Sequence, residues 1–85
     1  MLLTIAHFED TPMGATYTVK DADGKTQATA VVWAADIVPY SRRRWSVYRV
    51  RGGCDLDESK FGILEQFVNS RLGNGLEIDG VKIEV

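Results

Sequence analysis

The chain has 85 residues, of which 45% are hydrophobic and 26% charged, with two prolines, eight glycines and one cysteine. These are ordinary globular values, and they exclude a disordered tail, a collagen-like repeat and a disulfide scaffold. The length predicts one domain, 1–85, and no apolar run approaches the about 20 residues that span a bilayer, so we expect no membrane contact. The single cysteine and the absence of a signal-peptide pattern at the N-terminus predict a cytoplasmic protein.

Charge is distributed unevenly along the chain. Twelve acidic and ten basic residues give a net charge of −2. Half of the basic residues, however, lie in residues 42–51 (the arginine segment), which contains no acid. The chain should therefore present one basic ridge on an otherwise acidic body, a field that influences which partners it meets. The arginines of this segment are Arg42, Arg43, Arg44, Arg49 and Arg51.

The first half of the chain is expected to form three strands. Residues 2–8 are almost continuously apolar, which predicts a strand covered on both faces and central in its sheet. The turn residues 9–14 separate it from 15–20, where apolar and polar residues alternate as in a half-buried strand. Asp23-Gly24 predicts a tight turn into a return strand at 26–34. That strand is rich in alanine, and we expect a helix to lie across its small side chains.

Residues 36–41 contain Pro39 and are expected to form a loop, and an alternating strand follows at 44–51. In that strand Trp45 and Val47 share one face with Arg49 and Arg51. The opposite face carries Arg44, Ser46, Tyr48 and Val50.

The helix is predicted by apolar residues at helical spacing, namely Phe61, Leu64, Phe67, Val68 and Leu72. Asp57 is placed as its N-cap, and Leu56 and Phe61 as a hydrophobic staple. Gly73, followed by Asn74-Gly75, predicts a left-handed stop. Gly62 in the middle of the helix costs about 1 kcal/mol relative to alanine, and we expect it to mark a close approach to the sheet.

The last residues are predicted to form a hairpin. Leu76 and Ile78 occupy even positions, whereas Val81 and Ile83 occupy odd ones, so one straight strand would point them to opposite faces. A two-residue turn at Asp79-Gly80 brings them onto one face, and a bulge at Gly80 is the alternative explanation. The predicted order is β-β-β-β-α-β-β. The fold class is α+β, a mostly antiparallel sheet of four to six strands with one amphipathic helix packed on one face.

Few residues have the chemistry of a catalytic or metal site. His7 lies in an apolar strand, where we expect a partly buried structural histidine. Cys54 precedes the helix among acids that oppose thiolate formation, which favours a structural role. The carboxylate pairs at 21/23 and 55/57 are explained by turn and cap chemistry. We therefore expect no metal, no cofactor and no enzymatic activity.

The arginine segment is the feature that most needs a functional explanation. Arginines interleaved with Trp45 and Tyr48 can form a platform on which nucleic-acid bases stack while guanidinium groups hold phosphates. The same residue types are enriched at protein–protein hot spots. A third interpretation places Trp45 in the core and leaves the arginines solvated or paired with acids. The acidic pI of about 5.2 counts against a dedicated nucleic-acid binder.

Two functional hypotheses follow. The first is a small non-enzymatic protein-binding module, an inhibitor that occludes a nucleic-acid-processing enzyme or complex. Its acids, with Asp55, Asp57 and Glu58 as candidates, would compete for a basic channel while the arginine segment grips an acidic neighbour. Phage-encoded inhibitors, anti-CRISPR proteins among them, are similar in size and charge. A homodimer through an open sheet edge is a further expectation. The alternative is a nucleic-acid-binding module that uses the arginine segment, with binding that weakens steeply as salt rises.

Overall fold

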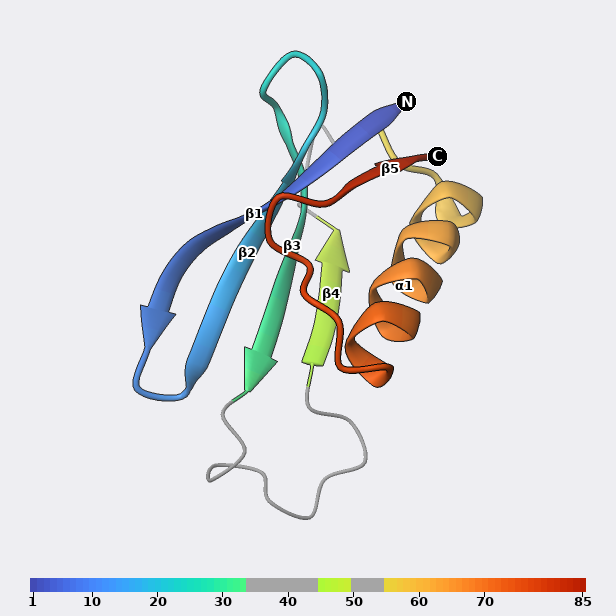
Figure 1. The fold of residues 1–85 in the computed structure, drawn as a ribbon. Coiled ribbons are helices and arrows are strands. Elements are labelled where there is room, and N and C mark those ends of the chain that lie inside the picture. Colours follow the sequence, from blue (N-terminus) through green and yellow to red (C-terminus); the bar gives the residue numbers. More distant parts are fainter. Residues whose placement is uncertain (34–44, 50–54) are drawn as a thin grey trace.

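The computed structural model describes residues 1–33, 45–49 and 55–85, which form five strands and one helix. The sheet is antiparallel in the order β4-β3-β2-β1-β5, and the helix lies along one face of it (Figure 1). This confirms the predicted α+β class. The elements are β1 (Leu2–Thr11), β2 (Gly14–Lys20), β3 (Thr26–Trp33), β4 (Trp45–Arg49), α1 (Glu58–Gly73) and β5 (Lys82–Glu84).

The core lies between the sheet and α1. Residues on the inner face are directly opposite one another, so that Ile5 pairs with Val19 and Val19 with Ala28. Small side chains on β3 leave room there for larger ones from the helix. The fully buried Ala28 and Ala30 belong to the same cluster as Leu64 and Val68 of α1. The cluster is completed by Leu3, Val47, Leu56, Ile78 and Ile83.

Strand β1 differs from its prediction in two respects. It lies inside the sheet, between β2 and β5, but only one of its faces is covered: Leu3 and Ile5 are fully buried, whereas Leu2 and Phe8 are exposed. The reason is that α1 packs on one side of the sheet only. The strand also continues to Thr11, because a turn at residues 12–13 is enough to reverse the chain.

The predicted helix and both of its ends are confirmed. Asp57 is the N-cap, and its Oδ1 accepts a hydrogen bond from the Lys60 amide at 2.8 Å. The left-handed residue of the stop is Gly75, with φ +72°. Around it the Leu76 amide donates to the Arg71 carbonyl at 2.8 Å, the bond that defines a Schellman motif. The prediction for Gly62 is wrong: this residue is exposed, and a Cβ built on it would meet nothing within 4 Å.

The predicted C-terminal hairpin is wrong, although its turn is present. The Val81 amide donates to the Ile78 carbonyl at 3.2 Å, and Gly80 has φ +75°. Residues 76–78, however, form no strand, and the exposed Leu76 does not share a face with Ile83. The backbone amide of Leu76 is already hydrogen-bonded to the last turn of the helix. Too few residues therefore remain before the turn to form a second hairpin arm.

Strand β5 instead pairs with the beginning of β1, and this pairing brings the two termini together. The Met1 amine lies 2.8 Å from the Val85 carbonyl and 2.9 Å from Glu84 Oε1. Within the described residues, β4 and β5 are the edge strands. The expected loop at 36–41, Cys54 and the ends of the strand predicted at 44–51 lie outside the described residues. No helix in the described ranges is long and apolar enough to cross a bilayer.

Candidate functional site: an acidic patch and exposed apolar side chains

The aromatic residues of the arginine segment lie on opposite faces of the sheet. Trp45 packs against the core, and its indole N–H donates to Asn69 Oδ1 of α1. Tyr48 projects from the other face and is 52% exposed. Because a strand alternates its side chains, the two rings do not form one stacking platform. Arg49 is the last residue of β4 and pairs with Ala28. The other arginines of the segment lie outside the described residues, namely Arg42, Arg43, Arg44 and Arg51.

The three candidate acids near the helix start lie together, and two of them have structural contacts. Asp57 caps α1, and Glu58 is exposed in the first turn. Asp55 accepts hydrogen bonds from two side chains of the β2–β3 hairpin, Lys25 and Gln27. Changing Asp55 or Asp57 would therefore perturb the fold as well as the surface charge.

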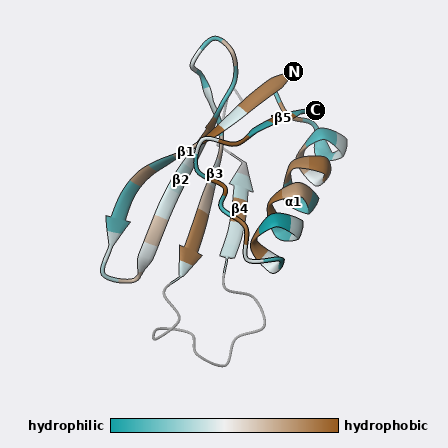
Figure 2. Ribbon diagram, viewed as in Figure 1, coloured by the Kyte–Doolittle hydropathy of each residue, from teal (hydrophilic) through white to brown (hydrophobic). Residues whose placement is uncertain are grey.

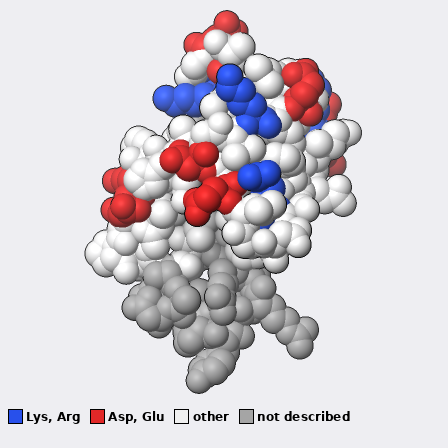
Figure 3. All heavy atoms as spheres, in the orientation of Figure 1, with Lys and Arg blue, Asp and Glu red and all other residues white. Residues whose placement is uncertain are grey.

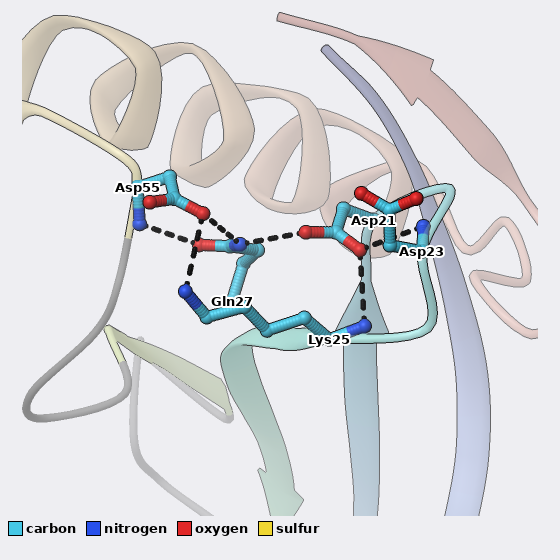
Figure 4. Close-up of polar contacts among 5 residues, drawn as sticks. All are labelled: Asp21, Asp23, Lys25, Gln27 and Asp55. Carbon is cyan, nitrogen blue, oxygen red and sulfur yellow. Dashed lines mark hydrogen bonds and ion pairs between the residues drawn. The ribbon is translucent and has the colours of Figure 1, made fainter.

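Asp55 belongs to a hydrogen-bonded group that we call the polar clamp, formed by Asp21, Lys25, Gln27 and Asp55 (Figure 4). Gln27 is fully buried, and its Nε2 donates to Asp21 Oδ2 and to Asp55 Oδ2, both at 2.9 Å. Its Oε1 accepts from the Asp55 amide at 2.7 Å. The clamp thus uses every polar atom of the buried amide to join the hairpin turn to the residues before α1.

Hydrogen bonding in the clamp favours the ionised form of both carboxylates. The hydrogen bond from Gln27 is the largest cause that lowers the pKa of Asp21, followed by the bond from the Lys25 amide. The pKa of Asp55 is lowered first by Gln27 and then by the Lys25 ammonium, which lies 3.3 Å away. The sequence does not predict the role of Gln27, because a lone glutamine in an alanine-rich strand carries no signal of burial.

A second group of acids surrounds Tyr17 at the other end of the helix. We define the acidic patch as Asp10, Glu77 and Asp79. Burial raises the pKa of Tyr17, and the negative charges of Glu77, Asp79 and Asp10 raise it further, in that order. Figure 3 shows acidic side chains gathered at the centre and left of this face, around the end of β1 and the segment that follows α1.

His7 connects the two halves of the acidic patch. Its Nε2 lies 2.9 Å from Asp10 Oδ1, and its backbone amide donates to Asp79 Oδ1 at 2.8 Å. Its ring meets that of Tyr17 edge to face, with the centroids 5.6 Å apart. The expected partly buried histidine is a surface residue here, because it lies where β1 passes beyond the cover of α1. Sequence reasoning assigned Asp10 and Asp79 to separate turns and missed their proximity, since the segments are about 70 residues apart in the chain.

Exposed apolar side chains accompany the acids on the β1–β2 hairpin. Phe8 is 65% exposed and Met13 is 56% exposed, the two highest values among the large hydrophobic residues that the structure describes. The other exposed apolar side chains lie elsewhere and include Ile63 on the helix, at 46%. Both side chains keep most of their apolar surface in water, and a partner that covered them would gain the free energy of burying that surface.

The described part of the molecule is acidic overall. Only one acid, Asp36, lies outside it, whereas four arginines do. Within the described residues no group of three or more His, Cys, Asp or Glu side chains is placed to hold a metal ion.

Comparison of the chain with family models, with curated proteins and with solved structures finds no match. A function must therefore be inferred from the chain's own residues.

Proposed function

We propose that the chain is a small protein-binding module that occupies a basic surface of its partner, with the acidic patch as its working surface. The observation that carries the proposal is that Asp10 and Asp79 both contact His7, with Glu77 two residues before Asp79 in the chain. Neither Glu77 nor Asp79 forms an ion pair with any described residue. Carboxylates on one side of the surface attract a partner of complementary charge.

The partner class follows from the same electrostatics. Proteins that process nucleic acids expose basic channels that bind phosphate groups, and an acidic patch on a compact body can compete for such a channel. The chain would then act as an inhibitor by occlusion and would need no catalytic group. Similarity to phage-encoded inhibitors in size and charge supports this proposal only as an analogy.

Capture of a partner from a lysate of the organism that encodes the chain tests the proposal. Tagged protein is incubated with two halves of the lysate, one of them treated with nuclease. We expect a basic protein that is retained in both halves. A signal that disappears with nuclease would contradict the proposal and favour direct binding of nucleic acid.

A pair of matched charge reversals identifies the working surface. Glu9→Lys with Glu77→Lys reverses one charge of the acidic patch and the charge next to Asp10 in the chain, and it keeps the Asp10 and Asp79 contacts to His7. Asp23→Lys with Glu58→Lys alters the net charge equally at the other end of the helix. We expect the first variant to lose at least about tenfold in partner affinity, and the second to change it by less than about threefold. Equal losses would contradict the assignment of the acidic patch, and melting curves check that both variants fold.

A second candidate function is supported by the sheet face opposite α1. Tyr48 is exposed there, and Lys20 and Lys82 are both paired with Thr4, which places the two lysines in one row across the sheet. Tyr48 lies on β4, two strands away from Lys20 on β2 and at the opposite edge from Lys82 on β5, so an extended single strand would cross the sheet to reach the ring and both lysines.

Binding to a dye-labelled single-stranded oligonucleotide tests this second function. It predicts affinity that falls steeply with salt, and loss of binding when Tyr48 is changed to alanine. The triple change of Arg42, Arg43 and Arg44 to alanine tests the contribution of those arginines. Binding that survives both sets of changes, or that is insensitive to salt, would contradict this candidate.

A further inference from the structure

We propose that residues 8–16, the outer part of the β1–β2 hairpin (the arm), form the anchor that enters the partner, and that the partner presents an apolar pocket bordered by lysines or arginines. This inference rests on the proposed protein-binding function and adds to it the contacting residues and the chemistry of the partner's surface.

The arm extends past the elements that cover the rest of β1. Strand β5 pairs only with Leu2–Thr4, and the contacts made by residues 79–81 reach no further along β1 than the His7 amide. Beyond His7, the outer edge of β1 has no pairing partner among the described residues. In Figure 1 the end of the hairpin lies at the lower left, far from α1 on the right, and in Figure 2 the end of β1 is hydrophilic.

Phe8 lies at a β-bulge in the arm. His7 is paired with Tyr17 and Glu9 with Thr16, so Phe8 is an extra residue without a partner on β2. A bulge redirects the side chain that it carries and accentuates the local twist, and bulges are common next to functional sites. At 65% exposure, the Phe8 ring has most of its surface available to a partner. Met13, at the hairpin turn, offers a second and more adaptable apolar contact on the same arm.

The charges around Phe8 determine what kind of pocket can accept it. Glu9 and Asp10 follow it directly in the chain, and both are exposed. An apolar pocket with an acidic rim would be repelled by these carboxylates, whereas a rim of lysines or arginines would be attracted. Pairing of the arm with the arm of a second copy is disfavoured for the same reason, since it would bring two sets of carboxylates together.

A photo-crosslinking experiment with matched positions tests the inference. The full chain is prepared with benzoylphenylalanine in place of Phe8 or in place of Ile63, an exposed apolar residue on the helix. Each is crosslinked in nuclease-treated lysate, and the attachment site on the captured protein is mapped by mass spectrometry. Binding is also measured for Phe8→Ser and for the control Ile63→Ser, with melting curves for both.

We expect crosslinks from position 8 and not from position 63, at a partner site with apolar residues flanked by lysine or arginine. Phe8→Ser should lower the affinity at least about tenfold, and Ile63→Ser by less than about twofold. If wild type binds a protein and Phe8→Ser binds it equally well, the arm is not the anchor, although the protein-binding function stands. Crosslinks to a second copy of the chain, or to an acidic surface, would overturn the inference. If wild type captures no protein, both proposals fail.

Discussion

Replacing Gln27 with leucine tests whether the polar clamp stabilises the fold. Leucine fits a site of similar volume but removes three hydrogen bonds, two of which go to carboxylates. Water can replace the lost donor at the carboxylates of Asp21 and Asp55, because neither residue is buried. The main penalty therefore comes from the backbone amide of Asp55, which loses its hydrogen-bond acceptor. A buried polar group without a partner costs about 1–3 kcal/mol, and the apolar burial of leucine offsets part of that loss. We expect the free energy of unfolding to fall by about 2 kcal/mol.

For a domain of this size, that loss lowers the melting temperature by about 8–16 °C. Urea unfolding followed by circular dichroism gives the free energy directly, with an unchanged m-value if the same surface is exposed on unfolding. Gln66→Leu, at an exposed helix position, is the matched control and should stay within about 0.5 kcal/mol of wild type. If Gln27→Leu is as stable as the control variant, the clamp does not contribute to stability in the way described.

Three further changes have defined outcomes. Asp57→Ala removes the N-cap and should lower the unfolding free energy by about 1 kcal/mol in urea titrations, whereas Asp57→Asn should retain most of it. Gly14→Ala should be among the most damaging substitutions, because its Cβ would lie 2.0 Å from the Val32 carbonyl at φ +151°; expression as stable, folded protein would contradict the strand geometry. The lowered pKa values of Asp21 and Asp55 contribute stability that is fully present above the unfolded-state pKa of about 4 and is lost as pH falls through the lower folded-state values. Urea midpoints measured from about pH 5 to about pH 2 should therefore fall more steeply for wild type than for Gln27→Leu.

The parts of the fold that sequence predicts are those fixed by local interactions. The helix from Glu58 to Gly73 is specified by apolar spacing, by Asp57 before it and by Gly75 after it, all within one short stretch of chain. The reversal at Asp23-Gly24 is equally local, because Asp21 and the glycine's positive φ form that turn. Such features need no knowledge of the rest of the molecule.

The features that sequence does not predict depend on contacts between distant segments. Leu76 alternates correctly with Ile78 for a strand, but the helix stop takes its backbone amide first. The acidic patch forms only because β5 pairs with β1 and thereby places Asp79 beside His7. Gln27 is buried because Asp55 reaches it from about 28 residues further along the chain. These residues have ordinary turn and strand propensities, so their proximity is a property of the fold alone.

The two groups of acids consequently have different roles in the proposed function. Asp21, Asp55 and Asp57 are held by hydrogen bonds that stabilise the hairpin and the helix start. Glu77 and Asp79 form no ion pair among the described residues, and Asp79 accepts one hydrogen bond, from the His7 amide next to the arm that carries Phe8. This contrast moves the proposed contact surface from the helix start, where the sequence favoured it, to the other end of the molecule.

Competition with nucleic acid tests most directly whether the chain occupies a basic surface of its partner. The partner captured from nuclease-treated lysate is purified and loaded with a fluorescent oligonucleotide, and the chain is then titrated in while fluorescence anisotropy is recorded. The account predicts that wild type displaces the oligonucleotide, and that the Glu9→Lys, Glu77→Lys variant needs at least about tenfold more protein to do so. A complex in which the chain and the oligonucleotide bind the partner together, or displacement that is unchanged by the double variant, would contradict it.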